Sequence, residues 1–102
     1  MGLTITVETE EGERIEQIAD PLNHLHRLLP SHDDQTYQCL RCIDWYGDTV
    51  FNRLQMETFL TELDRVRRAA RSPAEIELLA QIEKLARRCK AEPHLYLKFY
   101  GD

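Results

Sequence analysis

Alternating apolar and polar residues predict that the chain opens with a strand. Leu3, Ile5 and Val7 occupy every second position of residues 3–9, which is typical of a half-buried strand with these side chains inward. Gly12 follows two glutamates and predicts a turn with a positive φ. Residues 13–18 are expected to return as a second strand of an N-terminal hairpin, but their apolar positions also fit a helical stripe, so strand and helix both stay open.

A short helix is expected over about residues 21–29, because Asp20 suits the cap position and Pro21 suits the first turn. Spacing by three and four places Leu22, Leu25 and Leu29 on its inner side. Pro30 ends this helix, and residues 31–35 are polar and predict a loop.

Residues 36–54 predict a second hairpin. Residues 36–43 are rich in aromatic and apolar side chains and are expected to form a strand, as are residues 49–54. The intervening residues 44–48 contain Gly47 and Asp48 and predict the turn between the two strands.

Two amphipathic helices are expected next. Apolar residues recur every three or four positions from Met56 to Ala70, and again over about residues 73–90. Ser72, Pro73 and Glu75 fit the cap, the first helical position and the capping box of the second helix. The short connection predicts that the two helices are antiparallel neighbours.

Residues 94–100 alternate again and predict a closing strand with Leu95, Leu97 and Phe99 on one face. The element order is therefore β-β-α-β-β-α-α-β. It predicts one compact α+β domain over residues 1–102, in two layers, with an antiparallel or mixed sheet and helices packed on one face. If the closing strand lies at a sheet edge, it can also pair with another chain.

Composition narrows the classes of protein that fit. The chain has 102 residues, of which 42% are hydrophobic and 30% charged, as expected of one soluble domain. No apolar run is long enough for a membrane helix, and the three cysteines without a secretory leader predict reduced thiols and a cytoplasmic, bacterial-type protein without membrane contact. Phosphate-loop, dinucleotide and serine-nucleophile motifs are all absent, so no cofactor is expected and an enzyme is disfavoured.

The net charge of −5 is unevenly distributed. Eight acidic residues but only Arg14 and Arg27 lie in residues 1–35, which predicts an acidic surface that attracts a basic partner. The basic residues gather near the ends of the two long helices. They are Arg65, Arg67, Arg68, Arg71, Lys84, Arg87, Arg88 and Lys90. Nucleic-acid binding there is a third hypothesis, but cations near a helix C-terminus are also stabilised by the helix dipole alone.

Cys39 and Cys42 have the spacing of zinc and redox motifs. Within a strand, however, residues three apart point to opposite faces, so the expected strand prevents a shared metal ion or disulfide. Cys42 is expected in the core and Cys39 partly exposed, and Cys89 lies on a buried helical stripe. No metal site is therefore predicted.

Two loops contain the residues on which an enzyme or metal site would depend. They are His32, Asp33, Asp34, Asp44 and Asp48. Imidazole and carboxylates can perform acid–base chemistry or bind a hard cation, but aspartates also populate turns for local backbone reasons. This small enzyme or metal protein is the second hypothesis.

The leading hypothesis is a small acidic, non-enzymatic domain that binds and modulates another protein, in an immunity, inhibitor or accessory role. Trp45, Tyr46 and Asp48 lie at the expected hairpin tip, where Trp45 is either an exposed anchor or a cap on the core. Acidic residues of the first hairpin and tyrosines of the closing strand complete the expected contact surface. They are Glu8, Glu10, Glu11, Tyr96 and Tyr100. Monomer and homodimer both fit.

Overall fold

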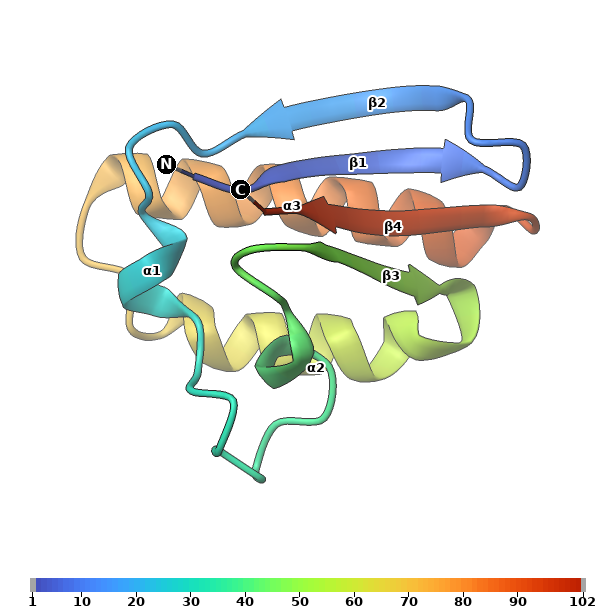
Figure 1. The fold of residues 1–102 in the computed structure, drawn as a ribbon. Helices are drawn as coiled ribbons and strands as arrows, with labels where there is room; N and C mark the ends of the chain where they lie inside the picture. Colours follow the sequence, from blue (N-terminus) through green and yellow to red (C-terminus); the bar gives the residue numbers. More distant parts are fainter. Residues whose placement is uncertain (1, 102) are drawn as a thin grey trace.

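A four-stranded antiparallel sheet forms one layer of the fold, and two long helices form the other (Figure 1). The structure is a computed structural model, and it describes residues 2–101. The strands are β1 (Thr4–Thr9), β2 (Arg14–Ala19), β3 (Asp48–Asn52) and β4 (Leu95–Tyr100), in the spatial order β2-β1-β4-β3. Helices α2 (Met56–Arg67) and α3 (Pro73–Ala91) cover one face of this sheet. The predicted two-layer α+β class is confirmed.

The N-terminal hairpin forms as expected, and the segment for which strand and helix both stayed open is strand β2, from Arg14 to Ala19. Thr4 of β1 is opposite Ala19 of β2, and Gly12 has a φ of 86° in the turn between them. Ile15 and Ile18 are both half-buried against the core, although residues three apart in a regular strand point to opposite faces. The β1–β2 register shifts between Val7 and Glu8, so the strand is not regular at Ile15.

The core lies between the sheet and the two long helices. Alternate residues of β1 and β4 point into it, among them Ile5, Val7, Leu97 and Phe99. The rings of Phe51, Phe59 and Phe99 contact one another there, with centroids 5.4–6.0 Å apart. The predicted inward positions of the first and last strands are therefore confirmed.

Strand β4 lies inside the sheet, between β1 and β3. It pairs with β1 from Thr4↔Tyr100 to Thr9↔Leu95, and with β3 from Asp48↔Tyr100 to Asn52↔Tyr96. The closing strand is therefore not an edge strand. Among residues 2–101 the edges are β2 and β3.

The expected strand over residues 36–43 is wrong, and so is the second hairpin. The segment is a loop that ends in the 3₁₀ helix η1 (Leu40–Cys42). The Glu62 carboxylate on α2 accepts the backbone N–H groups of Gln38, Cys39 and Leu40, which are then not free to bond a neighbouring strand. The position beside β3 is filled by β4, so the observed strand and helix order is β-β-α-β-α-α-β.

The expected helix over residues 21–29 is reduced to α1 (Leu25–Leu28). Asn23 has a φ of 57°, which interrupts a right-handed helix, and Leu22 is 77% exposed, not buried. The cap position is His24 and not Asp20 as predicted, although the Asp20 carboxylate accepts the N–H groups of His24 and Leu25 at the start of the helix.

The predicted bounds of the following elements need smaller corrections. Strand β3 ends at Asn52, because its side chain caps the 3₁₀ helix η2 (Arg53–Gln55). Helix α2 ends at Arg67, and Ser72 caps α3 by accepting the N–H of Glu75, as expected.

Candidate functional site

Exposed apolar and aromatic side chains follow edge strand β3. Tyr46 before the strand is 84% exposed, Val50 within it 51% and Leu54 after it 78%. They occupy every fourth position of residues 46–54, and we call this set the β3 surface. In the described part of the chain, the other large hydrophobic side chains with comparable exposure are Leu22 and Ile76. Sequence reasoning missed Val50 and Leu54, although this spacing is visible in the sequence.

The loop that presents Tyr46 is held by hydrogen bonds at both ends. The N–H of Asp44 bonds Thr49 Oγ1 at 2.9 Å, and the N–H of Tyr46 bonds Asp44 Oδ1 at 2.9 Å. The N–H of Gly101 bonds the carbonyl of Gly47 at 2.8 Å. Tyr46 is therefore an exposed ring on a loop whose backbone is held by hydrogen bonds, so binding at this loop costs less backbone entropy than ordering a mobile loop would.

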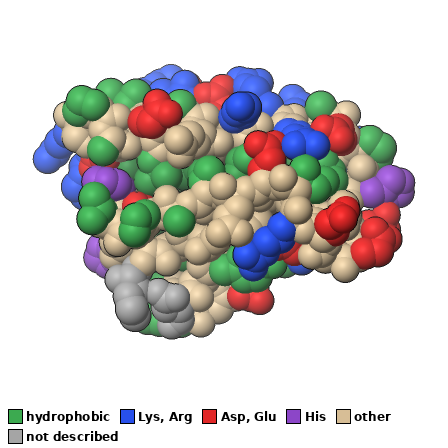
Figure 2. Space-filling model, turned by 90° about the horizontal axis from the view of Figure 1, so that it is seen from above, with side chains coloured by type: hydrophobic (Ala, Val, Ile, Leu, Met, Phe, Trp, Pro, Cys, Tyr) green, Lys and Arg blue, Asp and Glu red, His purple; other side chains and the backbone are tan. Residues whose placement is uncertain are grey.

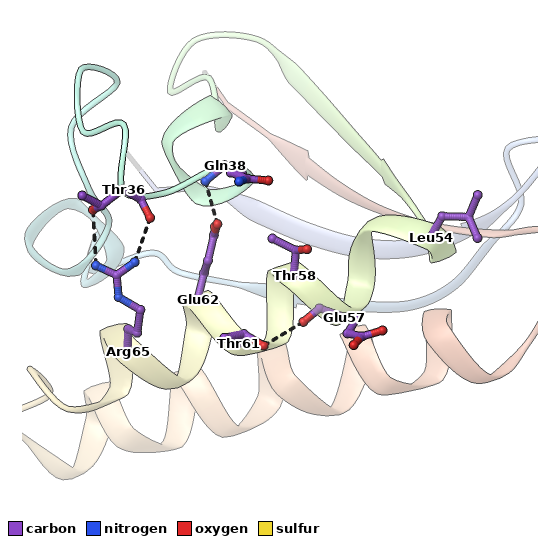
Figure 3. A pocket seen from close by; sticks show the side chains of 8 residues that line it. All are labelled: Thr36, Gln38, Leu54, Glu57, Thr58, Thr61, Glu62 and Arg65. Carbon is purple, nitrogen blue, oxygen red and sulfur yellow. Dashed lines mark hydrogen bonds between the residues drawn. The ribbon is translucent and has the colours of Figure 1, made fainter.

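Two open hollows flank Leu54. The first has a volume of about 400 Å³ and lies between α2 and residues 36–38 (Figure 3). The second has a volume of about 380 Å³ and lies between η2 and residues 93–96. Leu54 is thus a projecting side chain between two recesses, a shape that suits contact with a chain lying across it.

The polar side chains of the first hollow already have partners. Figure 3 shows Glu62 directed at the backbone of residue 38 and Arg65 directed at Thr36. The Arg65 guanidinium donates to the carbonyl and hydroxyl of Thr36 and stacks 4.1 Å from the centre of the Tyr37 ring. These groups stabilise the loop, and they are poorly placed to bind a small ligand.

Several predicted interaction residues lie on the sheet face opposite α2 and α3. Register places Asp48 beside Tyr100, and Glu8 beside Tyr96. Asp48 is exposed, whereas the two tyrosines are half-buried. Tyr96 also lines the second hollow, which connects this face with the β3 surface.

Glu8 is not the surface acid that its position in the sequence suggested, because it is only 2% exposed. Its carboxylate accepts the hydroxyls of Thr6 and Tyr100 and lies 3.1 Å from Lys98 Nζ. Burial acts to raise the pKa of this carboxyl, but the hydrogen bonds from Tyr100, Thr6 and Lys98 outweigh it and the pKa is lowered. Glu8 therefore organises its neighbours and is not available to a partner.

Glu10 and Glu11 lie in the turn between β1 and β2, far along the sheet from Tyr46. Both are exposed, and Glu10 pairs with His94. Acidic side chains lie at this end of the molecule in Figure 2. Glu10 and Glu11 therefore lie at the opposite end of the sheet from Tyr46 and Asp48.

Trp45 is half-buried and packs against the core, with its ring centroid 5.5 Å from that of His26. The sequence left two roles open for Trp45, an exposed anchor or a cap on the core, and this packing favours the cap. Trp45 closes one end of the core, and Tyr46 beside it is the exposed ring.

The loop residues of the enzyme or metal hypothesis are used in local contacts. His32 bonds the carbonyl of Ile43, and Asp34 accepts both the N–H and the hydroxyl of Thr36. Among residues 2–101, no group of three histidine, cysteine, aspartate or glutamate side chains is placed to hold a metal ion.

Most arginines at the helix ends pair with carboxylates. Glu83 binds both Arg67 and Arg87, while Arg88 bridges Glu16 and Glu92. Arg65 contacts the Thr36 and Tyr37 loop instead. Carboxylates therefore compensate four of the eight basic residues at the helix ends, namely Arg67, Arg68, Arg87 and Arg88, which makes these ends a weaker candidate for binding phosphates than their sequence indicated.

The two cysteines of the spaced pair have exchanged their expected environments. Cys39 is buried and Cys42 is exposed, because they lie in a turn and not in a strand. Cys89 is buried, as predicted.

None of the helices described has the length and apolar character needed to cross a membrane. No family model, curated protein or solved structure matches the chain, so its function is inferred from the β3 surface and the residues around it.

Proposed function

We propose that this chain is a non-enzymatic domain that binds an extended, basic segment of another protein along β3 and so modulates that protein, in an immunity, inhibitor or accessory role. One observation carries the proposal. Three of the five most exposed large hydrophobic side chains among residues 2–101 follow one edge strand, as Tyr46, Val50 and Leu54.

An edge strand favours an extended partner. Within residues 2–101, β3 pairs with β4 alone, so its other side offers backbone N–H and C=O groups to a further strand. A segment added there would gain main-chain hydrogen bonds, and the side chains beside it would select its sequence. Tyr46 and Leu54 at the two ends of β3 are suited to be the anchors, because buried aromatic and large apolar side chains dominate binding energy.

Charge favours a basic partner. Asp44 and Asp48 are both exposed on either side of Tyr46, and the chain has a net charge of −5. Opposite charges accelerate association and disfavour acidic competitors. The partner's lysine or arginine residues are therefore expected at the Tyr46 end of β3.

Site-specific photo-crosslinking in intact cells tests the proposal. The full chain carries p-benzoylphenylalanine in place of Tyr46, or in place of Ile76 as the matched control. We expect position 46 to capture one protein whose crosslinked peptide contains lysine or arginine, and position 76 not to capture it. Capture of a second copy of this chain, or equal capture at both positions, contradicts the proposal.

Binding to the purified partner then gives the second test. Tyr46→Ala and Leu54→Ala are expected to weaken binding at least about tenfold each, which is roughly 1.4 kcal/mol. The equally exposed Leu22→Ala is the control and should leave the affinity unchanged. Asp44→Asn with Asp48→Asn should slow association and reduce its dependence on salt. If none of the substitutions other than the control were to change the binding kinetics or the affinity, the β3 surface would not be the binding site.

A further inference from the structure

Cys39 and Cys42 lie at the two ends of one hydrogen-bonded turn. The N–H of Cys42 bonds the carbonyl of Cys39 at 3.0 Å, and Leu40–Cys42 form η1. Such a turn holds its first and last Cα atoms within about 7 Å. A disulfide needs a Cα separation of about 4.4–6.8 Å, so this backbone is compatible with a bond between the two sulfurs.

The two thiols differ in access. Cys42 is exposed, and its Sγ lies 3.4 Å from the carbonyl oxygen of Gln38. Cys39 is 5% exposed, and its Sγ lies 3.9 Å from the carbonyl oxygen of Gln55. Burial raises the pKa of Cys39 to about 11, and the negative charge of Glu62 adds to this effect. Cys42 is therefore the thiol that meets a reagent first, and Cys39 is the thiol that reacts second.

We propose that Cys39 and Cys42 are a modification site that forms a reversible intramolecular disulfide on reaction with a small-molecule disulfide, for which oxidised glutathione is the probe. The Cys42 thiolate attacks one sulfur of the probe, the sulfur–sulfur bond of the probe breaks, and one glutathione thiolate leaves. Cys39 then loses its proton to solvent and attacks the Cys42 sulfur, and the second glutathione thiolate leaves. The protein loses two electrons and two protons, and the probe is reduced to two thiols.

Bond formation has a structural consequence beyond the turn. The two sulfurs now contact different carbonyls, that of Gln55 in η2 for Cys39 and that of Gln38 for Cys42. Joining the sulfurs is therefore expected to move the Cys39 side chain and weaken its contact with Gln55. The backbone N–H of Cys39 is also one of the three held by Glu62. Oxidation is therefore expected to loosen residues 38–40 from α2. This inference does not depend on the proposed protein partner.

Intact mass spectrometry on the full chain tests it. Folded protein is incubated with oxidised glutathione, then denatured and alkylated with N-ethylmaleimide. Reduced protein should carry three adducts, one for each cysteine. The oxidised product should carry one adduct, on Cys89, and peptide mapping should join Cys39 to Cys42. Dithiothreitol should restore three adducts. A stable glutathione adduct on Cys42 as the end product, or a bond to Cys89, would overturn the proposal.

Three variants assign the roles. Cys39→Ser should stop at the glutathione adduct on Cys42, and Cys42→Ser should not react under folded conditions. Cys89→Ser should still lose both remaining alkylation sites, which makes it the matched control. Because Cys42 is exposed, Cys42→Ser is expected to fold normally, and reaction of Cys39 in that variant would contradict the proposed order of attack.

Discussion

At the scale of single residues, the neighbours Trp45 and Tyr46 have opposite surroundings. Trp45 packs against the core and beside His26. Its carbonyl oxygen lies so close to Gly101 that a Cβ atom on that residue would be only 2.3 Å from it. Tyr46 is 84% exposed. One ring therefore contributes to folding, and the other is free to contribute to binding.

Stability measurements separate these roles. Trp45→Ala is expected to lower the free energy of unfolding by about 2 kcal/mol, less than for a fully buried tryptophan because the ring is only half-buried. Tyr46→Ala is expected to change it by less than about 0.5 kcal/mol. Urea unfolding followed by circular dichroism measures both. A large loss for Tyr46→Ala would mean that this ring is packed, and would remove it from the β3 surface.

Glu62 accounts for the largest difference between the observed fold and the fold that the sequence pattern predicts. It is 4% exposed, and its carboxylate accepts N–H groups from Gln38, Cys39 and Leu40 at 2.6–3.0 Å. A charged acceptor with this many donors holds the loop against α2 more firmly than packing of a 3₁₀ helix alone.

Removing that acceptor should be costly. Glu62→Ala leaves buried N–H groups without a partner, and we expect a loss of about 3 kcal/mol in the free energy of unfolding. Glu57→Ala, at an exposed position of the same helix, is the control, with an expected change below about 0.5 kcal/mol. Hydrogen exchange should also show faster exchange at residues 38–40 in Glu62→Ala. Protected amides there would contradict the assigned role.

At the scale of elements, one ion pair joins α1 to α3. Arg27 on α1 donates to Glu75 on α3 through Nε at 2.8 Å, and through a second guanidinium nitrogen. Glu75 also accepts the N–H of Arg71, and Arg27 donates to the carbonyl of Ala69. A helix as short as α1 has little stability alone, so these contacts fix its position beside the α2–α3 connection.

This contact should make stability depend on pH. The Arg27 hydrogen bond, followed by the Arg71 N–H, lowers the pKa of Glu75 from 4.5 to about 2. The folded protein therefore binds this proton more weakly than the unfolded chain does. The stabilisation is fully present above pH 4.5 and is lost as the pH falls towards 2.

Comparison with Glu75→Gln isolates that effect from other carboxylates. Urea unfolding at a series of pH values should show wild type more stable than the variant at neutral pH. The difference should shrink as the pH falls below 4.5 and vanish only once the pH is below about 2. A difference that is the same at every pH would mean that Glu75 acts through packing and not through its charge.

At the scale of the whole molecule, local patterns predicted the fold class and most elements. The period of two in residues 3–9 and 94–100, and the capping signal at Ser72, act between near neighbours in the chain and can be read without a structure. Residues 36–43 could not be predicted in this way. Their conformation depends on Glu62, which lies more than twenty residues further along and appears in the sequence as one polar position of an amphipathic helix.

The candidate site was predictable only in part for the same reason. The composition of the loop was enough to predict Tyr46 and Asp48 as candidate interaction residues. The burial of Glu8, in contrast, depends on Lys98 and Tyr100 at the other end of the chain. The edge position of β3 follows from the insertion of β4 between β1 and β3, which pairing of sequential neighbours does not indicate.

That insertion also orders the events of biosynthesis. Until Leu95–Tyr100 have been made, β1 and β3 have no strand between them, so the hairpin and the helices emerge from the ribosome without a complete sheet to pack against. During that interval the inner faces of α2 and α3 are open to solvent and to chaperones. This domain is therefore expected to fold as a single late event, which waits until residues 95–100 have been made and can complete the sheet.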